Sequence, residues 1–186
     1  MSTTVLSGRV SVARALAETL LGDTGDRWSH TIGVAHRAEE LSVTVPPADR
    51  EVLVVAAWLH DIGYSRPLYL TGFHPLDGAT HLVRLGWPVR VAALVAHHSG
   101  AHFAAAEHGL SAELAEYPDE CSAVTDALCY ADQSVGPSGQ RLPIRVRMAE
   151  MLARHGAGSV QARIHGVRGP YLLAAADRVE RRLAEI

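Results

Sequence analysis

The chain has 186 residues, of which 48% are hydrophobic and 20% charged, a composition typical of one globular domain with its own core. The net charge is −3 and all 17 basic residues are arginine, so the composition offers no basic field for nucleic acid and no polybasic membrane patch. The first residues lack a basic region followed by an apolar core, and the longest apolar run is too short to span a bilayer, so we expect a cytoplasmic protein.

Helical patterns recur along the whole sequence, and no segment has the pattern of a strand hairpin. Helices are predicted over residues 9–21, 26–43, 48–61, 75–85, 88–98 and 120–132. Residues 64–73 form a looser stretch, residues 99–119 hold one or two short helices, and residues 134–139 form a turn-rich loop. Two or three helices complete the chain, the last over residues 170–185. The predicted fold class is an all-α orthogonal bundle, because no heptad repeat persists.

The two cysteines, Cys121 and Cys129, both fall in the predicted helix over residues 120–132. Their spacing fits neither a zinc knuckle nor a disulfide framework. We therefore expect both to be buried free thiols.

The dipeptide His60-Asp61 ends the most apolar run of the chain, residues 52–59, and Gly63 is the natural stop for that predicted helix. A carboxylate at the C-terminal end of a buried helix faces the negative pole of the helix dipole, and its burial is costly unless a cation is near. The chain has no lysine, and neither the apolar run nor the turn after it contains an arginine. These observations predict a metal ion bound by Asp61 and the neighbouring His60.

Two further polar residues lie on apolar helical stripes, His30 and Asp132. A histidine on such a stripe is more often a packed core residue than a ligand. Asp132 resembles Asp61 because it falls at the C-terminal end of its predicted helix. In the alternative, the helix ends earlier and Asp132 is a solvated loop residue.

Three other histidines are candidate donors. His74 precedes Pro75 at a helix entry, where it has no obvious packing role, although a solvated position is the alternative. His97 and His98 cannot both face the same side of a helix. The residues alone leave the choice open. The family resemblance described next favours His98, because it implies small residues after the matching histidine, as Ser99 and a glycine are here, and it leaves His97 as a neighbouring group.

The ordered set resembles the HD-domain superfamily of metal-dependent phosphohydrolases, specifically its two-metal branch. Its members here are His30, His60, Asp61, His74, His98 and Asp132. The resemblance covers about residues 27–147 of a single predicted domain, 1–186, on which residues 148–186 pack as C-terminal helices. It implies one metal held by His30, His60, Asp61 and Asp132, and a second held by His74 and His98, with Asp61 bridging.

Imidazole and carboxylate donors suit divalent manganese, iron, nickel, cobalt or zinc better than calcium. One or two such ions lower the pKa of a bound water molecule and polarise a phosphoryl oxygen. His60 and Asp61 are therefore the predicted catalytic residues.

Arginine is the expected phosphate-binding residue, because its planar fork matches phosphate oxygens and lysine is absent. Arg66 and Arg141 are predicted to face the substrate. Arg147 is a weaker candidate, because the resemblance associates an arginine in this position with a structural salt bridge. The expected partner is a small phosphate ester or nucleotide, with no nucleic-acid polymer and no membrane, and a homo-oligomer is left open.

The sequence lacks two motifs of better-defined branches. No Glu-Asp pair follows His60-Asp61, which argues against alarmone hydrolysis, and no Gly-Tyr-Pro follows His97-His98, which argues against cyclic-di-GMP hydrolysis. Two rival functions remain. One is a di-iron HD-type oxygenase, which is less favoured because such enzymes tend to hold substrate with lysines. The other is a metal-bearing binding or regulatory module with little turnover.

Overall fold

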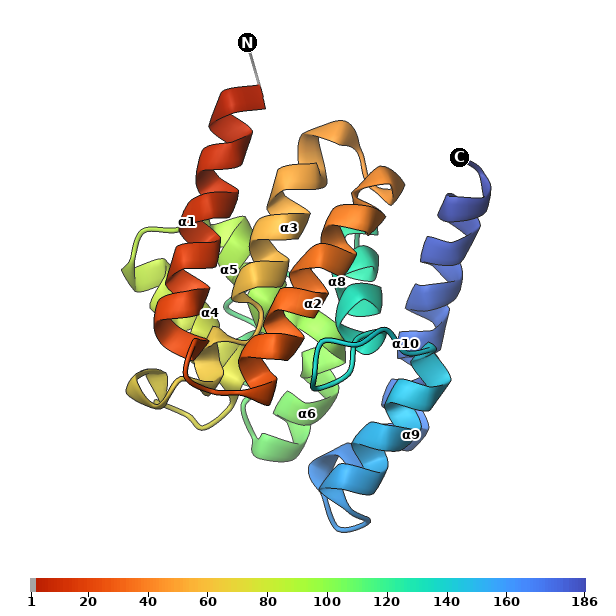
Figure 1. The fold of residues 1–186 in the computed structure, drawn as a ribbon. Coiled ribbons are helices and arrows are strands. Elements are labelled where there is room, and N and C mark those ends of the chain that lie inside the picture. The colour runs from red at the N-terminus through yellow and green to blue at the C-terminus, as the bar shows by residue number, and fades with distance from the viewer. Residues whose placement is uncertain (1–2) are drawn as a thin grey trace.

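Every regular element of the computed structural model is helical, within the described residues 3–186 and with side chains described from residue 8 onward (Figure 1). The only strand-like pairing in that part of the chain is an isolated bridge between Val135 and Arg141. The predicted all-α class is therefore confirmed. The α-helices are α1 (Thr3–Leu21), α2 (Asp26–Leu41), α3 (Arg50–Leu59), α4 (His74–Arg84), α5 (Val89–His97), α6 (Ala101–His108), α7 (Ser111–Leu114), α8 (Ala123–Gln133), α9 (Ile144–His155) and α10 (Val160–Ala184).

Helix α3 is the centre of the bundle, because α1, α2, α5 and α8 all pack against it. Every residue of α3 from Leu53 to Leu59 is buried. Burial of one such large aliphatic side chain contributes roughly 1.5–3 kcal/mol. The continuous apolar run in the sequence thus reflects a helix covered on all sides, and the turn that follows it is buried as well.

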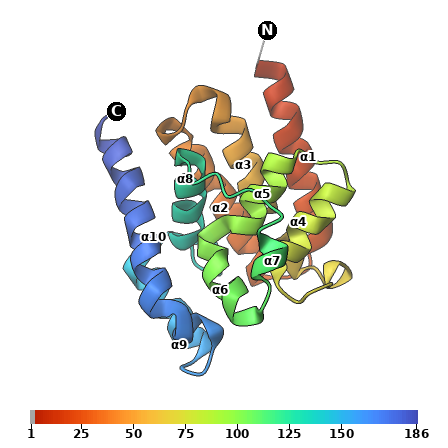
Figure 2. The same ribbon diagram turned by 180° about the vertical axis from the view of Figure 1, so that it is seen from behind.

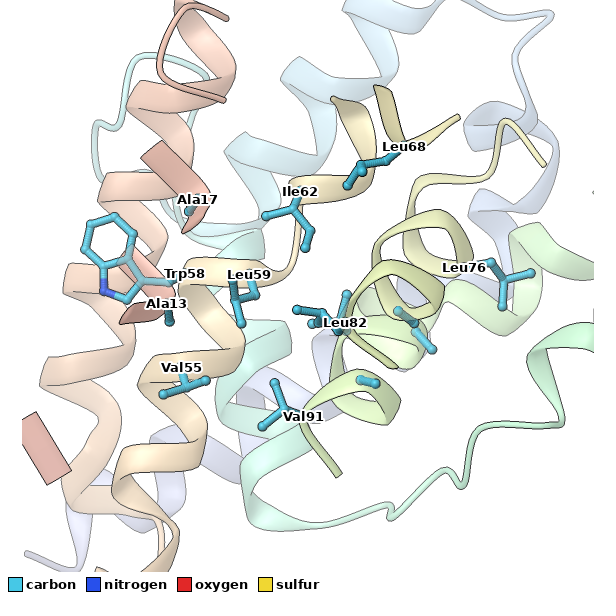
Figure 3. Close-up of a cluster of buried hydrophobic side chains, with 14 of the residues drawn as sticks. Ala13, Ala17, Val55, Trp58, Leu59, Ile62, Leu68, Leu76, Leu82 and Val91 are labelled. Atoms are coloured by element: carbon cyan, nitrogen blue, oxygen red, sulfur yellow. The ribbon is translucent and has the colours of Figure 1, made fainter. Parts of the chain in front are cut away.

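The two faces of α3 belong to two hydrophobic clusters. One face packs with α1, α4 and α5. Figure 3 shows Leu59 directed toward Leu82, and Trp58 on the other side of α3, beside Ala13 of α1. The other face packs with α2, α5 and α8. Seen from behind, α10 lies along α8 and continues toward α6, with α9 beside it (Figure 2).

Helix α8 begins later than the predicted start at residue 120. The hydroxyl oxygen of Ser122 accepts hydrogen bonds from the backbone N–H groups of Val124 and Thr125, at 3.1 and 3.3 Å. The Thr125 side chain in turn accepts from the Ser122 N–H, completing a capping box. This cap fixes the first helical residue at Ala123.

The prediction of two buried thiols was half wrong. Cys129 is buried inside α8, and burial raises the pKa of its thiol to about 12. Cys121 is exposed and precedes the helix, in a backbone conformation with φ of 42°. Because the Ser122 cap starts the helix after it, Cys121 lies in the loop.

The last helix was predicted to begin at Pro170, but α10 begins at Val160. The Ser159 hydroxyl oxygen accepts a hydrogen bond from the Ala162 N–H at 3.1 Å and caps this start. Pro170 lies inside the helix, where it has no N–H to donate to the carbonyl of Gly166. Burial of its apolar residues against the bundle offsets this loss; these are Leu172, Ala175, Ala176 and Val179.

Within residues 3–186, no helix is both long enough and apolar enough to cross a membrane.

Candidate metal centre

Six predicted donors from five separate segments converge at one place in the bundle. They are His30 in α2, His60 and Asp61 directly after α3, His74 at the start of α4, His98 directly after α5, and Asp132 near the end of α8. All are buried except His74, which is partly exposed. The tight packing of α3 against α2, α5 and α8 brings these helix ends together.

The donors form two groups, in each of which the ligand atoms lie within 4.8 Å of one another. The first group is His30, His60 and Asp132, with 3.0 Å between His30 Nε2 and Asp132 Oδ1. The second is Asp61, His74 and His98, with 3.3 Å between the two imidazole Nε2 atoms.

Asp61 belongs to the second group and also reaches the histidines of the first. Its Oδ1 is 3.4 Å from His74 Nε2 and 3.8 Å from His98 Nε2. Its Oδ2 is 3.3 Å from His60 Nε2 and 3.8 Å from His30 Nε2. One oxygen therefore faces each group, which is the arrangement that a carboxylate bridging two cations requires.

The histidine tautomers fit metal coordination. The Nδ1–H of His60 donates to the Ala57 carbonyl at 2.7 Å, and that of His98 donates to the Val95 carbonyl at 2.6 Å. The Nδ1 of His30 is likewise 3.3 Å from the Gly136 carbonyl. A carbonyl can only accept, so in the neutral ring the proton is on Nδ1 and Nε2 is the nitrogen that can bind a metal.

The electrostatics of the centre also favour a cation. The Nε2 of His60 is buried and has no hydrogen-bond partner. Burial alone would lower the pKa of His60, but the carboxylates of Asp61 and Asp132 raise it to about 9. Burial alone would raise the pKa of Asp61, whereas the neighbouring Arg27 and His60 lower it well below its usual value. The pKa of Asp132 is likewise lowered, so both carboxylates are ionised, and the raised pKa of His60 shows that they favour a positive charge at this buried position. Burial lowers the pKa of His74 and His98 and keeps these two imidazoles neutral. The residues present thus fit a divalent metal ion.

Comparison with known proteins agrees with this geometry. The HD domain family model matches residues 27–133, which contain all six donors. The chain belongs to the HD-domain family. No curated protein matches the chain, and no solved structure matches it.

The HD-domain site contains a cation that the sequence analysis missed. Nη1 of Arg27 donates to Asp61 Oδ2 at 2.5 Å, so an arginine from another helix lies beside this carboxylate although the adjacent sequence contains none. The Arg27 guanidinium carbon also lies 4.0 Å from the centre of the Tyr64 ring, and the Tyr64 ring stacks on the His74 ring at 3.9 Å. Arg27 lies one helical turn before His30, and that spacing was the available signal.

Asp132 is oriented by two neighbours. Its Oδ2 accepts hydrogen bonds from the Ser99 hydroxyl and from Gln133 Nε2, the latter at 2.8 Å. Its Oδ1 is left facing His30 and His60. Asp132 is thus buried inside α8, and the alternative of a solvated loop residue is excluded.

The structure separates the two neighbouring histidines that the sequence left open. His98 belongs to the second donor group, whereas His97 Nε2 donates to the Tyr117 carbonyl at 2.8 Å.

We expect wild-type protein to bind two divalent ions per chain, His98→Ala to bind one, and His97→Ala to retain two. Elemental analysis after gel filtration measures these contents, and equal losses in the two variants would contradict the assignment.

A cavity of about 330 Å³ opens over the centre. Its lining includes Asp61, His74, His98 and Asp132, together with residues of α9 and α10 that lie beyond the matched family region. This volume is at the lower end of the range for small-molecule sites. The cavity therefore has room for a small ligand.

The three arginines predicted to bind substrate lie in different places. Arg147 lines the cavity, but its Nε donates to the Val135 carbonyl at 2.7 Å and its Nη1 pairs with Glu150 at 2.6 Å. Arg66 is exposed and outside the cavity lining. Arg141 is also outside the lining and pairs with Glu40. Substrate contact by Arg66 and Arg141 stays a prediction without support from this geometry.

Proposed function

We propose that this HD-domain protein is a metal-dependent phosphohydrolase that cleaves a small phosphate ester or nucleotide. The observation that carries the proposal is the position of Asp61, with one carboxylate oxygen toward each donor group, at the floor of an arginine-lined cavity. Divalent ions at such donors lower the pKa of water and polarise a phosphoryl oxygen. The family match and the two donor groups support divalent metal binding, and two ions of manganese, iron, nickel, cobalt or zinc are part of the proposal.

The residues of the chain have separate tasks in this reaction. The backbone carbonyls that accept from His60 and His98 fix the imidazole rings, and Ser99 and Gln133 fix Asp132. Arg27 holds Asp61 from the cavity side, where its positive charge also faces an incoming phosphoryl group. In the net reaction the oxygen of water bonds to phosphorus, the phosphorus–oxygen ester bond breaks, and the alcohol leaves with a proton.

The principal rival is an HD-type di-iron oxygenase, because both reactions accept the same donors. The arginine side chains around the cavity favour a phosphate substrate, since the guanidinium fork pairs with phosphate oxygens. A metal-bearing regulatory module is the other alternative. It would bind metal and ligand with little turnover.

Oxygen labelling separates hydrolysis from oxygenation. We expect hydrolysis in ¹⁸O-labelled water to place one heavy oxygen in the released phosphate, at the same rate without air when manganese is supplied. Mass spectrometry of the phosphate, after screening aryl phosphates and nucleotides, is the measurement. Strict dependence on O₂ with no label from water would establish the oxygenase instead, and metal binding without turnover on any of these compounds would favour the regulatory module.

A further inference from the structure

Arg168 differs from the other arginines that line the cavity. It extends from α10 into the lining, yet no described carboxylate lies within 4.0 Å of its guanidinium. Each of the others has an acidic partner: Arg27 pairs with Asp61, and Arg147 and Arg154 pair with Glu150. Arg168 is therefore the cavity arginine whose charge is not neutralised by a direct ion pair within the described chain.

The Arg168 side chain is held in place from one side. Its Nε donates to the backbone carbonyl of Ser99 at 2.8 Å, while its two terminal nitrogens make no hydrogen bond to any described residue. Burial lowers the pKa of Arg168, and the more distant Asp132 offsets this only in part. An arginine stays charged in proteins even so, and this partly buried guanidinium has unused donors that a ligand entering the cavity can pair with.

Ser99 connects this arginine to the metal centre. The Ser99 carbonyl accepts from Arg168, and the Ser99 hydroxyl donates to Asp132, a candidate metal ligand. Arg168 therefore lines the same cavity as the metal centre, and Ser99 is the single residue that links it to Asp132. Arg27 engages Asp61, so it cannot offer a free fork in the same way.

We propose that Arg168 binds phosphate oxygens of the ligand through its two terminal nitrogens. The proposal rests on the proposed function insofar as that ligand is the substrate. Because α10 lies beyond residues 27–133, this contact is a contribution of the C-terminal helix pair and not of the matched HD-domain region. The substrate class that fits is a small phosphate compound whose phosphate reaches both the metal centre and α10.

Phosphate binding measured by calorimetry tests the proposal directly. Inorganic phosphate is titrated into manganese-loaded protein and into protein freed of metal with a chelator. We expect Arg168→Gln to weaken phosphate binding about tenfold or more, as for loss of a charge-assisted hydrogen bond. The control Arg181→Gln removes the same charge from an exposed position of α10 outside the cavity, and its phosphate affinity should equal that of wild type.

A purely structural role, in which Arg168 only holds the Ser99 turn, predicts different changes. It would lower metal content and melting temperature and leave phosphate affinity per metal-loaded chain unchanged, and that result overturns the proposal. Where Arg168→Gln fails to fold, Arg168→Lys decides, because it keeps the charge and a donor for Ser99 but lacks the fork. An affinity of Arg168→Lys below wild type supports the proposal, and equal affinities, or no phosphate binding by either protein, overturn it.

The same measurements separate this inference from the proposed function. Phosphate binding that depends on Arg168, in a protein that cleaves no phosphate ester, keeps the anion site and refutes the hydrolase. Ester hydrolysis with unchanged KM and phosphate affinity in Arg168→Gln refutes the anion site and keeps the hydrolase.

Discussion

Replacement of Asp61 by alanine is expected to reduce phosphatase turnover to below about 1% of wild type, a loss typical of essential catalytic groups. The two oxygens of Asp61 face different donor groups, so this substitution removes a ligand from both at once. Asp132 belongs to the first group only, where its Oδ1 faces His30 and His60. Asp132→Ala should therefore reduce the metal content by one ion, whereas Asp61→Ala should affect both sites.

Steady-state kinetics and elemental analysis of the same preparations measure this difference. Because Asp61→Ala also leaves Arg27 without its partner, Asp61→Asn is the second variant, since it keeps the shape of the side chain. Asp126→Asn is the matched control: Asp126 is a buried carboxylate of α8 that pairs with Arg178 and Arg182 and lies outside both donor groups. Near-wild-type turnover in folded Asp61→Asn and Asp61→Ala would show that the hydrolase mechanism is wrong.

The two carboxylate donors could be predicted from the sequence, because a carboxylate at the C-terminal end of an apolar helix is unusual. Asp61 and Asp132 follow apolar helical stripes and stand where the helix dipole disfavours negative charge. A buried carboxylate at a helix end is stable only when a positive charge or a hydrogen-bond donor lies beside it. The prediction that Asp61 and Asp132 lie in the interior is confirmed. The choice of His98 over His97 needed the structure, because it depends on which side of one turn faces the centre.

The positive charges were harder to predict. The sequence next to Asp61 gives no sign of Arg27, because the contact between the two residues spans 34 positions. Arg168 has no local signal, since its position in the cavity depends on how α10 packs across the bundle and reaches Ser99, 69 residues earlier. Arg66 is close to the His-Asp turn in the sequence, but it is exposed and does not line the cavity.

Gly63 was predicted as a helix stop, and the structure gives it a different task. Helix α3 ends at Leu59, and Gly63 lies in the following 3-10 turn, Ile62–Tyr64, which packs against α4. A Cβ at this position would lie 2.0 Å from the His74 carbonyl oxygen and 2.7 Å from the Gly78 backbone nitrogen. The absence of a side chain thus allows the His60-Asp61 turn to approach the start of α4.

Gly63→Ala is accordingly expected to destabilise the protein by about 3 kcal/mol, because backbone atoms cannot move aside as a flexible side chain would. The clash is with the backbone of His74 itself. The His74 imidazole should therefore move away from Asp61 and His98, and the second donor group should lose its metal ion. Urea unfolding followed by circular dichroism, with elemental analysis of the native protein, measures both effects. Gly166→Ala is the control, since a Cβ there meets nothing within 4 Å on an exposed helical position and should stabilise α10 by up to about 1 kcal/mol. If both glycine variants unfold at the same urea concentration as wild type, the close approach of the His-Asp turn to α4 does not hold the two donor groups together.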